Sequence, residues 1–137
     1  MSGKPVPVAT PETQPFWDGC QLRLLRIQWC DRCQQHFFYP RVACPACGSP
    51  ASVRWVDASG RATLYSYVIS QLPAPGYEPP FIIAIVQLAE GPRMLTNLVG
   101  IDADPGVLTL DMPLEVDFEP RGEMAVPVFR PSTASAA

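Results

Sequence analysis

Alternating apolar and polar residues mark a series of short strands in the second half of the chain. The candidate strands are rich in β-branched and aromatic side chains and occupy residues 62–72, 81–89, 93–100, 114–120 and 125–131. A proline-rich loop at 73–80 follows the first strand, and "EGP" at 90–92 reads as a tight turn within a hairpin. Five strands in this order predict a small closed or partly open barrel, and an OB-fold fits that count.

The first half of the chain has a different pattern. Thr10 is suited to cap a helix, Pro11 to its first turn and Glu12 to its positive end, so we expect a short helix around residues 11–20 that Pro15 limits. Residues 22–29, "LRLLRIQW", predict a strand that leads into a cysteine-rich segment.

The aromatic pair Phe16 and Trp17 lies inside the expected helix. Two roles stay open for these side chains: docking of the helix on the rest of the chain, or docking on a partner protein. We take partner docking as the working hypothesis.

Four cysteines in the segment "CDRCQQHFFYPRVACPAC" carry the clearest chemistry. Cys30, Cys33, Cys44 and Cys47 form two C-x2-C pairs separated by ten residues. This spacing is typical of a four-thiolate zinc site, in which two facing knuckles complete a tetrahedron. Disulfides are the alternative, but no leader of the secretory kind is visible at the start of the chain, and cytosolic proteins rarely keep structural disulfides.

The expected zinc ion is structural, because four thiolates leave no position open for a substrate or a water molecule. His36 lies between the pairs, but no ligand is missing, so a surface or packing role is the better interpretation. Cys20 stands alone before the motif, and with no second histidine to activate it we interpret it as a small buried residue. No catalytic residue is predicted.

Composition and charge restrict the fold and the cellular location that we expect. Seventeen prolines and nine glycines among 137 residues favour turns and short strands over helices. The longest clean apolar run is 81–86, far below the roughly 20 residues of a membrane span, so a cytoplasmic, membrane-free protein is expected. The net charge of −3 is unevenly spread: residues 20–61 hold six arginines against two acids, and residues 62–137 hold three against nine.

These patterns divide the chain into four parts. We expect an N-terminal lead and helix at 1–21, a zinc ribbon at 22–56, the barrel at 57–131 and a disordered tail at 132–137. The overall prediction is a mainly β protein with a short N-terminal helix, a zinc ribbon and a five-stranded barrel.

The order of motifs resembles a bacterial and archaeal family of proteins with a rubredoxin-like zinc ribbon and an OB-fold that accompany acyl-CoA enzymes. The resemblance covers nearly the whole chain. It rests on the cysteine pairs and on "PETQPFW" at 11–17, "YPRVACPACGS" at 39–49, Trp55, "SGRATLYSYVI" at 59–69, "PPFIIAIVQLAEGPRMLTNLVG" at 79–100 and "FRP" at 129–131. Arg61 departs from the family, whose members often carry a second glycine there.

The resemblance implies a non-catalytic scaffold subunit with structural Zn²⁺. Members of this family pair with thiolase-like enzymes, with lipid-transfer-protein-like aldolases or with hydratases of the MaoC type, including systems for lipid metabolism and steroid side-chain degradation. They bridge partner enzymes and help to hold the CoA portion of an acyl-CoA.

Particular residues suit a CoA ligand. Its phosphates require positive charge, which the ribbon offers through Arg32, Arg41 and Arg54, since arginine binds phosphate through paired charge-assisted bonds. Those arginines have an equally plausible role in offsetting the charge of a zinc–thiolate centre. The aromatic side chains that we expect beside the ligand are Phe38, Tyr39, Tyr77 and Phe81.

Two other classes of function fit the sequence less well. Zinc ribbons and OB-folds both bind single-stranded nucleic acid, but the acidic barrel half and the net charge of −3 argue against it, because phosphate neutralisation supplies most of such affinity. An independent enzyme is disfavoured because the sequence shows neither a Ser-His-Asp set nor a glycine-rich phosphate loop.

Overall fold

The computed structural model describes residues 4–132, and the expected disordered tail therefore lies outside the described residues except for Ser132. Within that range the structure holds no helix with the length and apolar character needed to cross a membrane. Its elements are α1 (Gln14–Gln21), β1 (Arg26–Cys30), β2 (Gln35–Phe37), β3 (Val53–Asp57), β4 (Arg61–Ser70), β5 (Phe81–Leu88), β6 (Arg93–Leu98), β7 (Pro113–Arg121) and β8 (Met124–Pro131).

Helix α1 begins three residues later than the sequence pattern predicted. Thr10 does not cap it; instead residues 10–13 form a turn in which the Thr13 N–H donates to the Thr10 carbonyl at 3.0 Å. Pro15 consequently lies in the first turn of the helix, where its missing N–H would have had no partner in any case. The proline that was expected to limit the helix marks its start.

The strand expected at 22–29 also starts later, at Arg26. The chain first has to close the helix: the N–H groups of Leu22 and Leu24 donate to the Gly19 carbonyl at 2.9 and 2.8 Å, and Arg23 has a positive φ of 61°. Once the chain has turned, β1 pairs with β2 and β3 in an antiparallel sheet of order β2-β1-β3. This sheet is the base of the ribbon.

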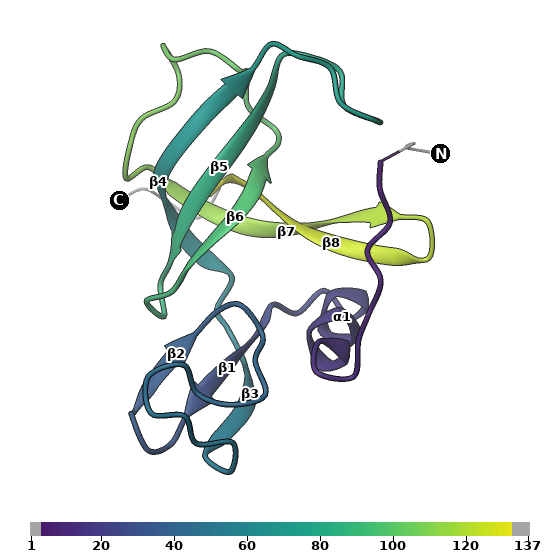
Figure 1. Ribbon diagram of the computed structural model, residues 1–137. Helices are drawn as coiled ribbons and strands as arrows, with labels where there is room; N and C mark the ends of the chain where they lie inside the picture. Colours follow the sequence, from purple (N-terminus) through teal and green to yellow (C-terminus); the bar gives the residue numbers. More distant parts are fainter. Residues whose placement is uncertain (1–3, 133–137) are drawn as a thin grey trace.

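The remaining five strands close into a barrel of order β4-β5-β6-β8-β7, which confirms the predicted five-stranded OB-fold (Figure 1). Strand β5 shows why the alternation in the sequence was informative, since every second side chain from Ile82 to Leu88 points into the barrel and is buried. The barrel is not uniform around its circumference. Strands β6 and β8 run parallel and pair only at Leu98 and Phe129.

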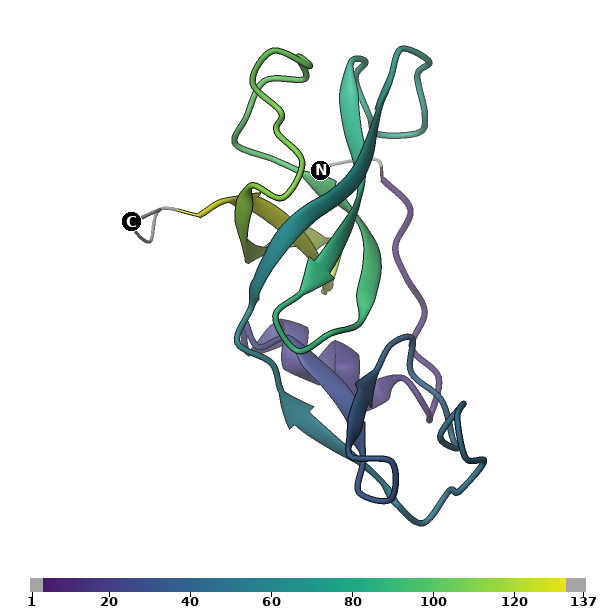
Figure 2. The ribbon, with the colours of Figure 1, turned by 90° about the vertical axis from the view of Figure 1, so that its left-hand side faces the viewer.

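One hydrophobic core joins the barrel to the helix and to the root of the ribbon. Leu64, Val86 and Phe129 fill the barrel with no exposed surface, while Leu25 from the segment before β1 and Phe16 from α1 belong to the same cluster. In the two perpendicular views the ribbon sheet lies below the barrel, and α1 lies beside the base of the barrel (Figures 1 and 2). The division points that we predicted at residues 22 and 57 stay predictions.

The segment before the helix is anchored on the barrel where the structure describes it. Residues 4–9 form neither helix nor strand, yet the Lys4 ammonium lies 3.0 Å from a Glu119 carboxylate oxygen and 4.4 Å from the centre of the Tyr77 ring. The lead therefore runs along the β7–β8 hairpin and contacts the loop before β5.

Candidate metal centre and ligand groove

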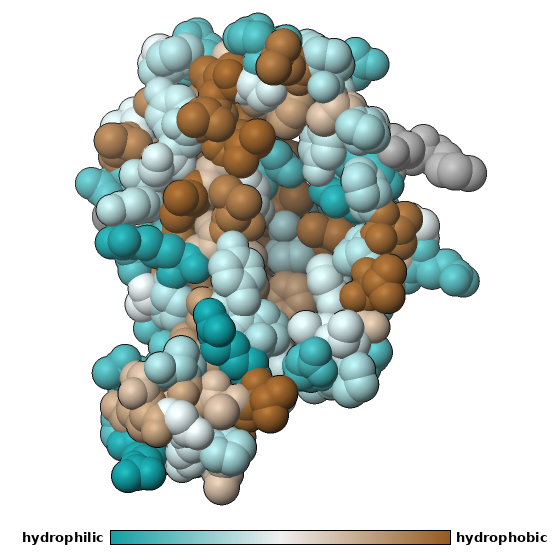
Figure 3. Space-filling model, viewed as in Figure 1, coloured by the Kyte–Doolittle hydropathy of each residue, from teal (hydrophilic) through white to brown (hydrophobic). Residues whose placement is uncertain are grey.

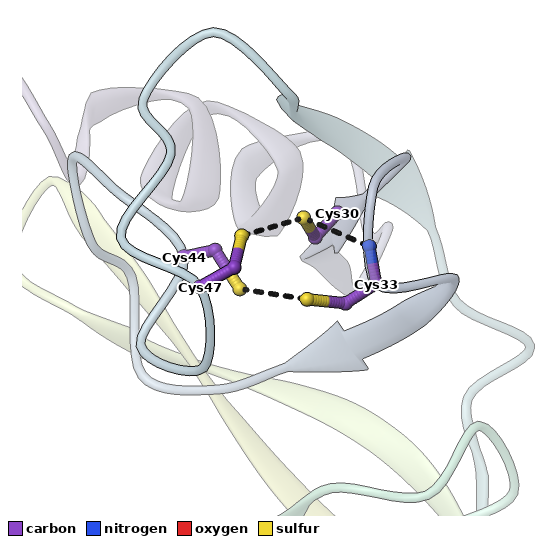
Figure 4. A group of neighbouring side chains, drawn as sticks. All are labelled: Cys30, Cys33, Cys44 and Cys47. Atoms are coloured by element: carbon purple, nitrogen blue, oxygen red, sulfur yellow. Dashed lines mark hydrogen bonds between the residues drawn. The ribbon is translucent and has the colours of Figure 1, made fainter.

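The two C-x2-C pairs meet at the tip of the ribbon, as Figure 4 shows. The sulfur atoms of Cys30 and Cys47 lie 3.7 Å apart, those of Cys33 and Cys44 lie 3.8 Å apart, and all four lie within 4.8 Å of one another. A tetrahedral zinc ion with Zn–S bonds of ~2.3 Å needs sulfurs about 3.8 Å apart. The four cysteines are therefore positioned to bind one zinc ion.

The backbone of each knuckle is arranged to stabilise negative sulfur. The N–H of Cys33 donates to Cys30 Sγ and the N–H of Ala46 donates to Cys44 Sγ, each at 3.4 Å. The backbone N–H groups of Cys47 and Ala46 lower the pKa of the Cys44 thiol to about 7, whereas neighbouring sulfurs, Cys47 first, raise the pKa of Cys33 to about 12. A bound zinc ion would deprotonate all four thiols, and the four thiolates would fill its coordination shell, so its role would be structural.

His36, which the sequence did not favour as a ligand, and Cys20, which it did not favour as a nucleophile, are not part of the four-sulfur cluster. His36 packs against Trp29 with ring centres 4.7 Å apart. Cys20 is only 1% exposed, and burial raises the pKa of its thiol to about 12, so it stays an inert neutral side chain in the core.

A groove of about 680 Å³ lies between α1, the ribbon and the barrel. Its walls come from segments far apart in the sequence: Phe16 and Trp17 of α1; Phe38, Tyr39 and Pro40 after β2; Tyr77 and Phe81 around the start of β5; Leu95 and Asn97 of β6; and Arg121, Val126 and Pro127 of the β7–β8 hairpin. In the space-filling view the molecule is hollowed here, between apolar side chains over β5 and β6 and those over the hairpin (Figure 3).

Aromatic rings build one wall of the groove by contacting one another. Phe16 lies against Trp17 and Phe38, with ring centres 4.8 and 5.6 Å apart, and Phe38 lies 4.4 Å from Tyr39. Phe16 is 5% exposed, so its ring supports the wall from inside the core, and Trp17 is half-buried. The partner-docking role of this pair stays a prediction.

A polar network occupies one end of the groove. The Tyr77 hydroxyl donates to Asn97 Oδ1 at 3.3 Å and accepts from the Arg121 guanidinium at 2.5 Å, while the Tyr77 ring stacks on Phe81 at 4.8 Å. Arg121 also pairs with Glu119 at 3.2 Å and its side chain is only 12% exposed. Arg121 therefore holds Tyr77 in place and has little charge left to offer a ligand.

The sequence-predicted CoA residues separate into two groups. The aromatic residues Phe38, Tyr39, Tyr77 and Phe81 all line the groove. The three arginines do not: each is exposed on the ribbon.

Two of these arginines lie in well-defined surroundings. Arg54 pairs with Asp31 at 3.1 Å. Arg41 borders a separate hollow of about 390 Å³ that Gln28 and Trp55 also line. Phosphate binding by the arginines stays a prediction, and so does the ligand role of the aromatic residues.

Sequence reasoning missed the contributions of β6 and of the β7–β8 hairpin to the groove. Leu95 and Asn97 lie in a strand that reads as an ordinary barrel strand, and Arg121 lies near a turn. No local signal marks them, because they line the groove only where β6 and β8 part.

The ribbon and the barrel together define the class of protein to which this chain belongs: a zinc ribbon followed by an OB-fold. Residues 17–53 match the family model described as the ChsH2 rubredoxin-like zinc ribbon domain, and residues 55–119 match that of the ChsH2 C-terminal OB-fold domain. The chain belongs to this ChsH2 family, whose members also include DUF35 scaffold proteins.

The similarity extends over almost all of the chain. A solved structure titled "Ltp2-ChsH2(DUF35) aldolase" has 36% sequence identity and a TM-score of 0.81, over 92% of this chain and 98% of that one. A DUF35 domain-containing scaffold protein of Methanothermobacter thermautotrophicus is 30% identical over 65% of this chain and 67% of its own length.

Two further relatives are named as enzyme subunits. A probable enoyl-CoA hydratase alpha subunit of Thermomonospora curvata is 36% identical over 94% of this chain. A 3-oxo-4,17-pregnadiene-20-carboxyl-CoA hydratase alpha subunit of Mycobacterium tuberculosis is 37% identical over 82% of this chain. The chain spans only 40% and 35% of their respective lengths, so the match covers one portion of each subunit.

Proposed function

We propose that this chain is a non-catalytic accessory subunit that binds the CoA portion of an acyl-CoA and works with a partner enzyme in lipid or steroid side-chain metabolism. The observation that carries the proposal is the aromatic-lined groove between the ribbon and the barrel. Its volume of about 680 Å³ falls in the range of roughly 300–1,000 Å³ typical of small-molecule sites.

The character of the groove suits one part of CoA better than the rest. Its walls are mostly apolar and aromatic, which fits the pantetheine arm and the beginning of an acyl chain. The exposed arginines Arg32, Arg41 and Arg54 lie on the ribbon outside the groove, where the charged adenosine diphosphate end would extend. Arg41 follows Pro40, a residue of the groove wall, so it is the arginine best placed to meet a phosphate.

The lack of a catalytic role is supported by what surrounds the groove. Four sulfurs would fill the shell of a zinc ion, and the single histidine of the chain packs against Trp29 outside the groove. The DUF35 relatives are named as scaffold proteins, and the solved relative carries the name of an aldolase together with Ltp2. A thiolase-like enzyme, an aldolase or a hydratase is the partner that we propose.

Binding is tested with the purified chain, CoA and an acyl-CoA by titration calorimetry. Tryptophan fluorescence gives a second measurement of binding. Trp17 lines the groove while Trp29 and Trp55 do not, so a ligand in the groove should change the fluorescence emission of one tryptophan of three. We expect Tyr77→Ala to weaken binding at least fivefold. Tyr65→Ala, outside the groove, should leave binding unchanged. Absence of CoA binding, or equal binding by both variants, would refute the proposed site.

The partner is tested by co-expression with candidate thiolase-like, aldolase and hydratase subunits. A stable complex, with partner activity that depends on this chain, is the expected result. Turnover of acyl-CoA by the isolated chain would contradict the non-catalytic role. Salt-sensitive binding of single-stranded DNA, without CoA binding, would favour the nucleic-acid alternative.

A further inference from the structure

The single lysine of the chain lies in the segment before α1 and is largely covered. The Lys4 side chain is 19% exposed, and its ammonium donates to both oxygens of the Glu119 carboxylate at 3.0 and 3.1 Å. The ammonium also lies 4.4 Å from the centre of the Tyr77 ring, within the range of a cation–π contact. Lysine side chains are mostly exposed unless they are paired, so these contacts hold Lys4 in place.

The residues that hold Lys4 belong to the polar network at one end of the groove. Tyr77 and Arg121 line the groove, and Glu119 pairs with Arg121 at 3.2 Å. The Arg121 guanidinium also donates to the Pro5 carbonyl at 3.3 Å and to the Tyr77 hydroxyl at 2.5 Å. The beginning of the described chain is therefore attached to the same side chains that fix this end of the groove.

Residues 4–9, which we call the strap, are otherwise held weakly. They form neither helix nor strand. Val6 and Val8 are 50% and 84% exposed, and Pro5 and Pro7 have no N–H to donate to a neighbouring strand. Segments with few buried contacts open at a low cost in free energy, so the strap can leave its position while the barrel stays folded.

The loop between β4 and β5 depends on Tyr77 for its position. Residues 71–80 are exposed except for Ala74, Tyr77 and Pro79, which are partly buried. The Tyr77 ring stacks on Phe81 at 4.8 Å, and the Tyr77 N–H donates to the Ala74 carbonyl at 2.8 Å. Movement of Tyr77 would therefore move the loop that borders this end of the groove.

We propose that Lys4 is a positioning residue, through which the strap holds Tyr77 and the loop at 73–80 against the β7–β8 hairpin. When the Lys4 ammonium leaves Glu119, the strap lifts from the hairpin, Tyr77 loses a neighbour and the loop becomes more mobile. This arrangement is a property of the chain without a ligand. Only its effect on ligand exchange rests on the proposed function.

The positive charge of Lys4 is the basis of this role. The Glu119 side chain is 22% exposed and pairs with two cations, Lys4 and Arg121. An uncharged side chain at position 4 would lose both the charge-assisted bonds to Glu119 and the attraction to the Tyr77 ring. Arginine at this position would keep the charge.

Nuclear magnetic resonance of the ¹³C-lysine-labelled chain tests the contact directly, since one lysine gives one set of side-chain signals. We expect the ring current of Tyr77 to displace the Lys4 Cε–Hε signal upfield. Glu119→Gln should return the signal towards the position of free lysine. Glu123→Gln, which removes an exposed carboxylate from the turn of the same hairpin, is the matched control and should leave it in place. An undisplaced signal in the parent chain, or no change in Glu119→Gln, would overturn the proposal.

Hydrogen exchange at the Tyr77 N–H measures the effect on the loop. Lys4→Met keeps an unbranched side chain without the charge, and it should speed this exchange by about 3- to 20-fold, as expected for the loss of one hydrogen bond to a charged group. Lys4→Arg should restore most of the parent rate, which a purely steric role would not predict. Exchange at Val86, inside the barrel, should be unchanged in both variants. Equal exchange at Tyr77 in the parent and in Lys4→Met would contradict the positioning role.

Release of CoA, followed by stopped-flow fluorescence, tests whether the strap governs the groove. We expect faster release from Lys4→Met than from the parent chain or Lys4→Arg. Equal release rates with a more mobile loop would overturn the effect on ligand exchange and leave the positioning role standing. Failure of CoA to bind at all would refute the proposed function, whereas the two experiments without ligand would still decide the role of Lys4.

Discussion

Replacing Cys30 with serine removes one sulfur from the zinc centre and tests how the metal supports the ribbon. Cys30 ends β1 and is completely buried, and its sulfur lies 3.7 Å from that of Cys47. A hydroxyl is a poor substitute for a thiolate, because neutral serine carries no charge for the ion. We therefore expect Cys30→Ser to lose zinc at neutral pH.

The size of the effect follows from comparing the metal with the apolar surface of the ribbon. Structural zinc sites supply an apparent binding free energy of ~10–16 kcal/mol at neutral pH. Leu25 and Ile27, at 2% and 0% exposure, contribute roughly 1.5–3 kcal/mol each, and both pack into the shared core. Zinc binding contributes more than these side chains together, so the knuckles and residues 31–52 should lose their structure while the barrel stays folded.

Zinc content by atomic absorption and the ¹⁵N amide spectrum measure this outcome. Cys30→Ser should contain no stoichiometric zinc and lose dispersed resonances from the ribbon, while those of β4–β8 persist. Cys20→Ala is the matched control, since it removes a buried sulfur outside the cluster and should keep one zinc per chain. A zinc-free variant with an intact ribbon spectrum would refute the reasoning, and so would collapse of the barrel together with the ribbon.

Three further predictions concern the barrel. Gly60 has φ +83°, and a Cβ there would lie 2.7 Å from Val116 Cγ1, so Gly60→Ala should lower the free energy of unfolding in urea by ~2–4 kcal/mol. Adding Val116→Ala should recover part of the loss. Equal stability of the single and double variants would contradict the steric cause. The pKa of Asp117 is lowered, first by the backbone N–H of the next residue, so it adds stability above its ordinary pKa of 3.8 that is lost as the pH falls below that value. Asp117→Asn should flatten the acid limb of a stability–pH curve, and an unchanged slope would disprove the linkage. Leu64→Ala, at a fully buried site, should cost ~2–5 kcal/mol, against under ~0.5 kcal/mol for Val68→Ala, which is 59% exposed; similar losses would show that burial does not set the effect.

The zinc ligands and the barrel strands were predictable because their signals are local. Two C-x2-C pairs ten residues apart are a recognisable zinc-ligand pattern in the sequence itself, and the alternation in Phe81–Leu88 reports directly which side chains face inward. The predicted start of α1 was wrong because two competing start signals, Thr10 with Pro11 and Thr13 with Pro15, lie a few residues apart. Sequence alone does not rank them, since the turn at 10–13 depends on hydrogen bonds formed in the folded chain.

The groove was only partly predictable. Its aromatic residues were named from their types, and the structure brings Phe38, Tyr39, Tyr77 and Phe81 together. The contribution of Leu95 and Asn97 was not visible, because they line the groove only where segments distant in sequence come together. Which residues of β6 face the groove depends on the sheet topology and not on the strand sequence alone.

The parting of β6 and β8 also bears on why the groove persists when nothing fills it. In the β7–β8 pair, Pro127 lies opposite Phe118, and the backbone of Pro127 faces β6. The Pro127 carbonyl accepts a hydrogen bond from Thr96 Oγ1 at 3.2 Å. Proline has no N–H, so the nitrogen of Pro127 cannot donate a further backbone hydrogen bond to β6. Strand pairing therefore does not extend from Phe129 to close this side of the groove. A single proline thus limits the pairing of β6 with β8 and keeps the barrel partly open between these two strands.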